Sequence, residues 1–329
     1  TANDASGITY NQGGVGASSR TIENKLQETV SVLDFGAVGD GVTDDTAAIQ
    51  AALAIGGLVT LPEGTYLVTR SASIILTCIS GTRLIGVPGK TTIKVSASPV
   101  ATAIIGSTSA VTDISVTGVI FDGGSFASTS GIDFTNVKRL TVEDCKFFDL
   151  TTHGIVAGEL VLAEDVSVER GEFRTVTVNG IKVLNTRRLY ANNNKFFDFV
   201  TSPIDTGPTV SADDEALRII TNNYFNNDSA GWTSGHSTIS LLGDRCLCYG
   251  NTIIGGGHIV VHSAGGFARE LADYRISNNS ITDPIGNAIT GNQDINSAIV
   301  ITGNTIKGCT LSGISVVGDG LASKPNRTT

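Results

Sequence analysis

The sequence is poor in charge and in long apolar runs. Charged residues make up 16% of its 329 residues, against about 25% in an average soluble domain. No run of about 18 apolar residues is present, so we expect no membrane-spanning helix. Acidic residues number 31 against 22 basic ones, a formal net charge of −9, and this disfavours a nucleic-acid binder, which needs a basic face. The chain also has no methionine and begins at Thr1, and we expect it to be a trimmed piece of a longer protein.

Cysteine is scarce and shows no spacing that carries chemistry. The five cysteines form neither a C-x-x-C pair nor a Cys/His metal pattern. Cys246 and Cys248 lie two residues apart in an apolar stretch, so in a strand they share one face. We expect small buried thiols in a reduced protein, and we expect neither a metal nor a cofactor.

Glycine is abundant and accompanies an internal repeat. The 39 glycines are 12% of the chain, against about 7% on average. A polar or Asn-rich step followed by Phe or Ile recurs roughly every 26 residues. The apolar anchors are Phe121, Phe147, Phe173, Phe196, Phe225, Ile253, Ile281 and Ile306. A second apolar step follows them, at Ile132, Ile155, Ile181, Leu217, Ile239, Ile259, Ile289 and Ile314.

The repeat predicts the fold class. No helix-length amphipathic pattern lies between the apolar steps, and the turns are rich in Asn, Asp and Gly. A short repeat made only of strands pairs its backbone with the coils above and below, so we expect an all-β, single-stranded parallel β-helix. The anchors then form ladders inside the coil. The asparagines before them are expected to stack and to bond to turn backbones rather than to bind ligands.

Residues 31–53 predict a strand, a Gly-rich turn and a short capping helix. Thr43 or Asp44 is placed to accept hydrogen bonds from the first free helix amides, and acids favour a helix N-terminus. Alanines, Ile49 and Leu53 give this helix an apolar side. It can plug the open end of a β-helix, whose first coil otherwise exposes its core and its strand edges.

The stretch from Asp34 to Gln50 closely resembles the D-F-G-A-x-G-D-G-x-x-D-D-T-x-A-I-Q head of the pectate-lyase-like superfamily. The resemblance implies a right-handed parallel β-helix. It also implies that Asp44-Asp45 is a helix cap and not a catalytic pair. It implies no single reaction, because polysaccharide hydrolases, lyases, epimerases and non-enzymes share this head.

The segment before the head resembles the neck of bacteriophage and prophage tailspikes. It begins at Ile8-Thr9-Tyr10 and continues after a Gly-rich step, where Ile22, Leu26 and Val30 recur at spacing four, as in a short amphipathic helix against a partner chain. The tailspike resemblance implies a homotrimer in the virion tail that contacts other tail proteins through this neck. It also implies a bacterial surface polysaccharide as ligand and, in many members, depolymerase activity.

These features divide the chain. We expect a neck at 1–30, a β-helix at 31–318 with its capping head at 31–55, and a polar tail at 319–329. Family members usually carry a further C-terminal trimerisation or carbohydrate-binding module. We therefore expect that the chain is truncated or that another chain caps its end.

One irregularity in the repeats indicates where chemistry is expected. In the segment from 198 to 216, four acids fall within eleven residues, Asp205, Asp213, Asp214 and Glu215. Insertions in a solenoid usually build its binding face. The next long turn holds His236 and the only tryptophan, Trp232, whose ring suits a sugar face. We expect the side chains just before each second strand to stack on adjacent coils. The predicted column is His153, Asn179, Asp213/Asp214, His236 and His258.

Part of this column resembles the polygalacturonase family of glycoside hydrolases, which places D-D and then G-H-G on successive coils. Asp213-Asp214 match the first motif, and Gly235-His236-Ser237 matches two positions of the second. The family's N-x-D and R-x-K motifs have no full counterpart. The resemblance implies that Asp213 is the general acid, that Asp214 helps to activate water and that His236 orients Asp213. The expected substrate contacts are Trp232, Asn179, His258, Asp205 and Glu215.

Three functions and one structural alternative stay open. Our main hypothesis is a tailspike depolymerase that hydrolyses capsule or O-antigen with two carboxylates. The second is a lyase or epimerase with a base such as Lys182, Arg218 or Arg269, often with calcium held by acids. The third is a non-catalytic receptor-binding or structural tail-fibre protein. The structural alternative is that the acids form only a solvated turn.

Overall fold

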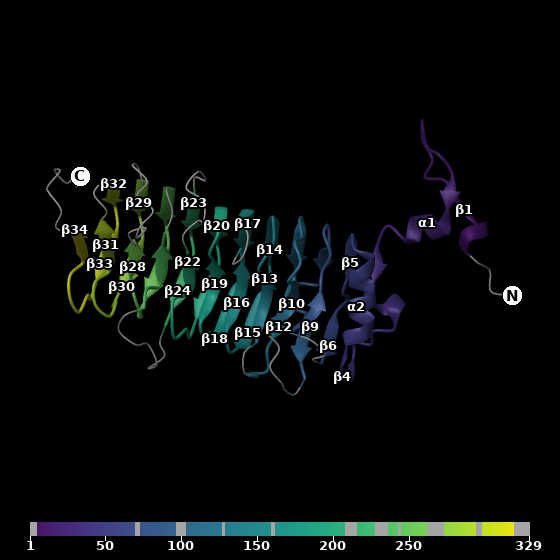
Figure 1. The fold of residues 1–329 in the computed structure, drawn as a ribbon, viewed down its shortest axis with the longest axis horizontal. Helices are drawn as coiled ribbons and strands as arrows, with labels where there is room; N and C mark the ends of the chain where they lie inside the picture. Colours follow the sequence, from purple (N-terminus) through teal and green to yellow (C-terminus); the bar gives the residue numbers. More distant parts are fainter. Residues whose placement is uncertain are drawn as a thin grey trace.

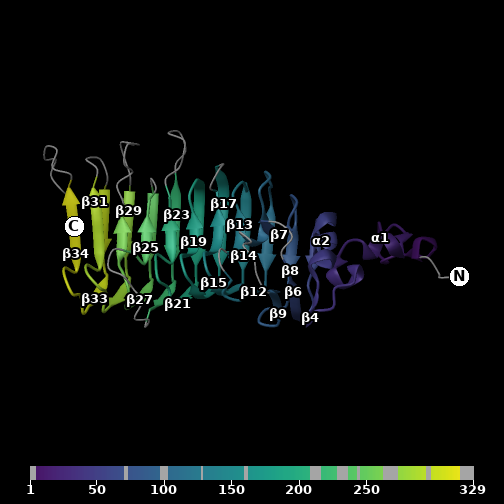
Figure 2. The ribbon, with the colours of Figure 1, turned by 60° about the horizontal axis from the view of Figure 1, so that its bottom comes forward.

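The protein is one long coil of short parallel strands. The computed structural model describes residues 5–69, 73–96, 103–126, 129–158, 162–207, 216–227, 236–242, 245–261, 273–293 and 298–318. Three parallel sheets run side by side along the coil axis (Figure 1, Figure 2). The predicted all-β, right-handed parallel β-helix with an N-terminal capping helix is confirmed.

Each sheet receives one strand from almost every coil. Sheet I holds β4 (Asp40–Asp44), β6 (Gly64–Val68), β9 (Thr91–Val95), β12 (Val119–Asp122), β15 (Lys146–Leu150), β18 (Glu172–Val176), β21 (Lys195–Phe197), β24 (Tyr224–Asn226), β27 (Thr252–Ile254), β30 (Ser280–Thr282) and β33 (Thr305–Lys307). Sheet II holds β7 (Ile74–Thr77), β10 (Ala103–Ser107), β13 (Ser130–Phe134), β16 (His153–Ala157), β19 (Asn179–Val183), β22 (Ile204–Thr206), β25 (Ile239–Leu241), β28 (Ile259–Val261), β31 (Ile289–Gln293) and β34 (Ile314–Gly318). Sheet III holds β3 (Val30–Ser31), β5 (Leu58–Thr60), β8 (Arg83–Ile85), β11 (Ile114–Thr117), β14 (Arg139–Glu143), β17 (Ala163–Glu169), β20 (Thr186–Asn192), β23 (Leu217–Thr221), β26 (Arg245–Tyr249), β29 (Asp273–Ser277) and β32 (Ala298–Thr302). Within a coil the chain passes from sheet III to sheet I and then to sheet II.

The predicted anchors form one column inside sheet I. All eight are in register from Phe121 on β12 to Ile306 on β33. The five phenylalanine rings stack with centroids 4.7–5.3 Å apart and nearly parallel planes. Strand pairing fixes the ring spacing near the strand separation of about 4.8 Å, so the core is filled by a continuous aromatic stack.

The second predicted ladder lies inside sheet II, with one correction. Ile132, Ile155, Ile181, Ile239, Ile259, Ile289 and Ile314 are in register, and the missing member is Ile204 on β22. The prediction of Leu217 was wrong, because Leu217 begins β23 of sheet III. Pro203 precedes Ile204, so this strand lacks the Gly-Ile step that marks β13, β16 and β19.

Glycine is required in that step by close packing. A Cβ on Gly154 would lie 2.7 Å from the ring of Phe173 and 2.6 Å from the carbonyl oxygen of Gly180. A Cβ on Gly180 would lie 2.6 Å from the ring of Phe196. The glycine of each Gly-Ile step therefore packs directly against the ring of a Phe anchor. This contact places the start of a sheet II strand against the aromatic stack.

A buried asparagine ladder runs along the corner before sheet I. Asn223 donates from Nδ2 to the Ala191 carbonyl at 2.9 Å and to Asn251 Oδ1 at 3.0 Å. Its own Oδ1 accepts from the backbone and side-chain nitrogens of Asn194 at 2.9 and 3.0 Å. The pattern continues through Asn279 to Asn304. The predicted stacking of these residues on turn backbones is confirmed, because their amide groups satisfy one another and the chain.

The outer faces of sheets III and I carry ladders of alternating charge. On sheet III, Asp113, Arg139, Asp165 and Arg188 follow one another in successive coils, and Arg139 contacts Asp113 at 2.5 Å while Arg188 pairs with Asp165. On sheet I, Lys146, Glu172 and Lys195 are in register, with Lys146 and Glu172 3.3 Å apart. Each carboxylate thus has a cation on a neighbouring coil.

The capping helix α2 (Thr46–Ile55) takes the place of a sheet II strand in the first coil. It follows β4 of sheet I and precedes β5 of sheet III, and Figure 1 shows it at the N-terminal end of the coil. Ile49, Ala52 and Leu53 are fully buried. The helix therefore covers the core cross-section, as the sequence predicted.

The two adjacent acids of the head have separate structural roles. Asp44 Oδ1 accepts from the Thr46 backbone nitrogen at 3.0 Å, which is the expected cap. Asp45 is 1% exposed, and its carboxylate accepts from Val38 N at 2.7 Å and Gly39 N at 3.1 Å. Asp44 thus caps the helix, and Asp45 holds the Gly-rich turn against it.

The neck differs from the expected helix. Helix α1 covers only Ile22–Leu26, and Val30 lies in β3, the first strand of sheet III. The prediction that Val30 continues an amphipathic helix was wrong, because this β-branched residue begins the coil. Two short antiparallel strands, β1 (Thr9–Tyr10) and β2 (Arg20–Thr21), precede α1. No helix of the described residues is long and apolar enough to cross a membrane.

The five cysteines form no disulfide bond, and all of them except the partly buried Cys309 are buried, as expected. Cys246 and Cys248 are both buried on the inner face of β26. Burial raises the pKa of the Cys78 and Cys145 thiols to about 12. These thiols are therefore protonated and unreactive at neutral pH.

Candidate functional site

The outer face of sheet II carries a polar row across the middle of the coil. The pairing registers align Asp133, Val156, Lys182, Asp205 and Ser240 on five successive strands, β13 to β25. Side chains of neighbouring strands in one row lie about 4.8 Å apart. Lys182 and Asp205 are half-buried, whereas Asp133 is 7% exposed. Lys182 and Asp205 are therefore direct neighbours, whereas Val156 separates Lys182 from Asp133. Val156 and Ser240 are buried, so the row exposes one cation beside one carboxylate.

A second set of polar groups lies where the sheet II strands begin. His153 and Asn179 are in register, as predicted. Asn179 Nδ2 donates to the Ser202 carbonyl at 2.6 Å, and Ser202 Oγ lies 3.1 Å from Ser237 Oγ. These groups bond to one another, and Asn179 and Ser237 are buried. His153 and Ser202 are the partly exposed residues of this edge.

The rest of the predicted column is not formed as expected. Four isoleucines of sheet II are in register: Ile181, Ile204, Ile239 and Ile259. Asn179 lies two residues before the first of them. The residues in register with Asn179 are therefore Ser202 and Ser237, each two residues before the isoleucine of its own strand. His236 precedes Ser237 by one residue and so lies outside this column. In the next coil the residue in register with Asn179 is Gly257, and His258 follows it by one residue. The two histidines therefore do not stack on Asn179.

The two acids expected to be catalytic follow a strand of sheet II rather than precede one. Asp213, Asp214 and Glu215 lie outside the described residues, as does Trp232. Their chain segments are bounded by described strands: the acids come between β22 and β23, and Trp232 comes between β24 and β25. The first segment leaves sheet II at the end of β22, and the second enters sheet II at the start of β25. The two segments are thus attached at opposite ends of the parallel strands of sheet II, the sheet that carries Asp205.

The residues considered as alternative bases are placed differently from one another. Arg218 is fully buried on the inner face of β23, and its Nη1 donates to the Thr186 carbonyl at 2.7 Å. It does not face a ligand on the outside of the coil, so its use as a base there was a wrong expectation. Lys182 lies on the outer row, and Arg269 lies outside the described residues.

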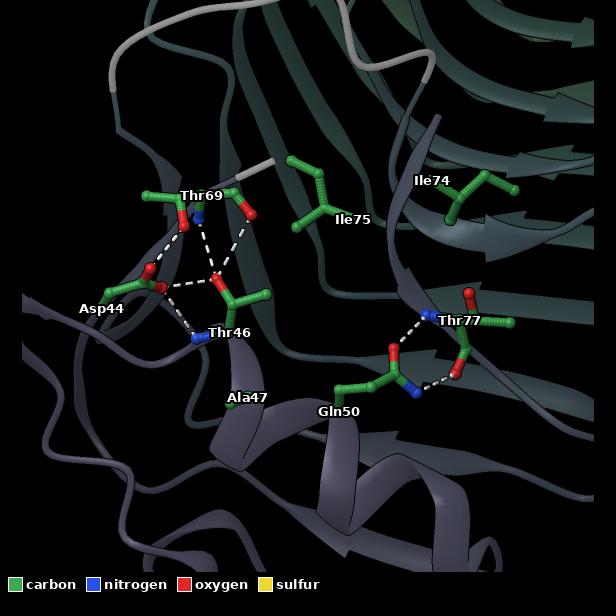
Figure 3. Close-up of a pocket in the computed structure, with 8 residues that line it drawn as sticks. All are labelled: Asp44, Thr46, Ala47, Gln50, Thr69, Ile74, Ile75 and Thr77. Atoms are coloured by element: carbon green, nitrogen blue, oxygen red, sulfur yellow. Dashed lines mark hydrogen bonds between the residues drawn. The ribbon is translucent and has the colours of Figure 1, made fainter. Parts of the chain in front are cut away.

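A cavity of about 470 Å³ lies beside the capping helix (Figure 3). Thr46 and Thr69 both contact Asp44, and Gln50 pairs with the backbone of Thr77. These polar groups are engaged in closing the first coil. We therefore assign this cavity to the cap and not to catalysis. No group of three potential metal ligands occurs among the residues that the structure describes.

A family comparison agrees with the fold. The sequence model described as "Rhamnogalacturonase A/epimerase, pectate lyase-like" matches residues 29–198, more than half of the chain. The chain belongs to this family. The matched region begins just before the head of the chain and ends before Asp205, so it identifies the coil and not the acidic segment.

Curated relatives match shorter stretches. The mannuronan C5-epimerase AlgE2 of Azotobacter vinelandii is 34% identical over 157 residues, 45% of this chain and 14% of the epimerase. The tail spike protein of Shigella phage Sf6 is 39% identical over 75 residues, 23% of this chain and 12% of that protein. The chain thus matches only a small part of each relative.

Solved structures share the fold over nearly the whole chain. The tailspike protein of E. coli bacteriophage HK620, in complex with a pentasaccharide, has a TM-score of 0.58 at 17% identity and covers 93% of this chain and 55% of its own. The ORF18 protein of Geobacillus virus E2 has a TM-score of 0.55 at 17% identity, with 92% and 64% covered. These structures show the shared fold, and together with the tail spike sequence of Shigella phage Sf6 they support the tailspike resemblance.

Proposed function

We propose that this chain is the β-helical body of a bacteriophage tailspike that binds a bacterial surface polysaccharide and hydrolyses it. The polar row on sheet II carries this proposal. Lys182 and Asp205 lie on adjacent strands there, beside the amide and hydroxyl edge at Asn179 and Ser202. Donors and acceptors on adjacent parallel strands suit the repeated hydroxyls of an extended sugar chain.

The hydrolytic part of the proposal rests on the acids that follow β22. Glycoside hydrolysis needs one carboxylic acid to protonate the leaving oxygen and one carboxylate to activate water or to attack. Two adjacent acids repel each other, which raises the pKa of one of them and suits it to donate a proton. We assign Asp213 as the acid and Asp214 as the group that activates water. His236 precedes β25, at the other end of the sheet II strands, so we do not assign it to orient Asp213. Trp232 and Glu215 are the proposed substrate contacts from the same segments.

The experiment compares the full chain with Asp213→Asn and Asp214→Asn on host capsule or O-antigen. We expect each variant to lose about 100-fold or more in the release of reducing ends. Asp273→Asn, on the outer face of sheet III, is the matched control and should keep the parent rate. Cleavage by both Asn variants at the parent rate would show that these acids are not catalytic.

A lyase or epimerase is the second candidate, and the match to the mannuronan C5-epimerase favours it. Both reactions remove a proton from a uronate. An unsaturated product, or a change of uronate configuration without chain shortening, would support this function over hydrolysis. Binding without any chemical change would instead support a receptor-binding role. Lys182 is a member of the polar row, and it is the base that we would test for a lyase or epimerase reaction.

Assembly is a separate part of the proposal. The tail spike relatives and the neck sequence support a homotrimer attached to the virion tail through residues before the coil. Light scattering of the full chain measures this directly. A monomer at micromolar concentration would contradict the trimer without affecting the assignment of the polysaccharide site.

A further inference from the structure

A second cavity of about 470 Å³ lies on the corner between sheets III and I, away from the polar row of sheet II. We call it the corner groove. Polar and charged residues from three successive coils line it: Asp144 with Lys146, Arg170 with Glu172, and Asn193 with Lys195. The turn at Pro88-Gly89 also lines it. The strands β15, β18 and β21 that leave the groove lie side by side in sheet I (Figure 1).

The groove contains one cation that is not paired with a carboxylate of the described residues. Lys146, Arg170 and Lys195 line it together with two carboxylates. Arg170 is held by Asp144, with nitrogen–oxygen distances of 2.7 and 3.0 Å, and it also contacts Glu143 and Glu169 at the rim. Lys146 lies 3.3 Å from Glu172. Lys195 is exposed and makes no ion pair with any residue in the described part of the chain, so its ammonium is available to an anion.

The backbone is strained at one position in this groove and at a second position near the far end of the strand that leaves it. The corner before sheet I places one residue per coil in the left-handed region, and Asp, Asn or Gly fills nearly every such position. Arg170 is the exception, with φ of 54°. At the next corner Thr175, a β-branched residue, has φ of 52°. Such residues are outliers in this region, and strain of this kind concentrates at binding sites. Both outliers flank or lie in β18, the central strand of the groove.

Packed side chains on the outer face of sheet I hold Glu172 in place beside the groove. Arg174 donates to Glu172 at 2.6 Å, and its guanidinium lies 3.8 Å from the centre of the Phe197 ring. Tyr224 packs on the same ring with centroids 5.8 Å apart. Glu172 is thus fixed between Arg174 and Lys146, with its carboxylate at the groove wall.

We propose that the corner groove binds an acidic sugar residue, a hexuronate, as a second carbohydrate site. The sugar carboxylate binds Lys195, and Asp144, Glu172 and the Asn193 amide accept or donate hydrogen bonds to its hydroxyls. A neutral sugar would leave the Lys195 charge unmatched. This site lies on another face than the sheet II row and requires no chemistry, so it stands independently of hydrolysis.

The test is calorimetric binding of a mannuronate hexamer, and of its carboxyl-reduced form, to the full chain. Lys195→Gln should weaken binding of the acidic hexamer about tenfold, because a hydrogen bond to a charged group is lost. Lys307→Gln, an exposed lysine on the last strand of the same sheet, is the control and should bind as the parent does. The reduced hexamer should bind the parent as weakly as the acidic one binds Lys195→Gln.

Lys182→Gln separates this inference from the proposed function. If Lys182→Gln loses binding and Lys195→Gln does not, the acidic sugar binds the sheet II row, the corner groove is not its site, and the proposed function stands. If Lys195→Gln loses binding while the Asp213 and Asp214 variants keep the parent cleavage rate, the groove stands and the catalytic assignment fails. Equal binding of both hexamers, or none of either, overturns the acidic-sugar site. A change in oligomeric state of Lys195→Gln would assign the groove to a second copy of the chain instead.

Discussion

At the scale of single residues, the contact between glycine and phenylalanine decides how tightly the coils pack. Gly154 has space for hydrogen only, because the Phe173 ring and the Gly180 carbonyl approach it from two sides. The same position in the last coil, Gly313, has no atom closer than 3.8 Å. The chain therefore offers a tight and a loose version of one position.

We predict that Gly154→Ala lowers the free energy of unfolding by about 2–3 kcal/mol, since an inserted methyl group must displace backbone. Gly313→Ala should change it by less than about 0.5 kcal/mol. Urea unfolding followed by circular dichroism measures both. Equal effects of the two substitutions would show that the backbone shifts to accept the methyl group, and that the contact is not tight.

The sequence predicts the inner residues better than the outer ones, for a physical reason. Phe121 to Ile306 were found because each coil must fill the same core position, so their identity repeats with the coil. Ile204 was missed because Pro203 replaces the glycine that marks its neighbours. The left-handed Arg170 was missed because nothing in an arginine signals that conformation. Neither Lys182 nor Lys195 repeats, since outer positions are free of the packing constraint.

At the scale of elements, α2 closes the open edge of sheet II with a side chain. Gln50 Nε2 donates to the Thr77 carbonyl at 3.1 Å, and Gln50 Oε1 accepts from the Thr77 nitrogen at 2.8 Å (Figure 3). The amide group thus makes the two bonds that a neighbouring strand would make with β7. These two bonds satisfy the Thr77 backbone at the edge of sheet II and so disfavour pairing of this end of β7 with another chain.

We predict that Gln50→Ala destabilises the protein by about 1–2 kcal/mol, through the loss of two hydrogen bonds. Exchange of the Thr77 amide proton with solvent should become faster while exchange in β16 stays unchanged. Gln27→Ala, which removes a single exposed contact to Glu23 in the neck, is the control. Unchanged protection of Thr77 in Gln50→Ala would contradict the role of the amide as an edge cap.

The acidic segment shows why the element containing a site is harder to predict than the fold. The residues from 198 to 216 resemble one long insertion, yet they contain the short strand β22, which carries Asp205, and only after it Asp213, Asp214 and Glu215. A three-residue strand with no Gly-Ile step leaves almost no periodic signal. The predicted column failed at this strand, and the histidines were assigned to the wrong level in consequence.

At the scale of the whole molecule, stability depends on carboxylates paired between coils. Hydrogen bonds from Arg139, Arg170 and Arg188 hold the pKa of Asp113, Asp144 and Asp165 below the ordinary value of 3.8. A carboxyl whose pKa is lowered by folding stabilises the protein fully above its unfolded pKa, and this contribution is lost as the pH falls through the folded pKa.

We therefore predict a melting temperature that is level from pH 7 to about 5 and that falls as the pH drops below about 4. Scanning calorimetry across this range measures it. Arg139→Gln together with Arg188→Gln should flatten the fall, because the pKa of each partner then returns toward its ordinary value. A fall of the same size in this double variant would place the acid-sensitive groups elsewhere.

The alternating charge ladders have a consequence for how the coil is assembled. Arg139 and Arg188 are two coils apart, as are Lys146 and Lys195, with an acid between each pair. If one coil looped out during folding and the next took its place, arginine would face arginine and lysine would face lysine across a single strand spacing. The hydrophobic ladders do not disfavour such a skipped coil, because nearly identical residues occupy the same core position in every coil. The outer charges therefore disfavour a misfolded state with a skipped coil, which the repeated core residues would tolerate.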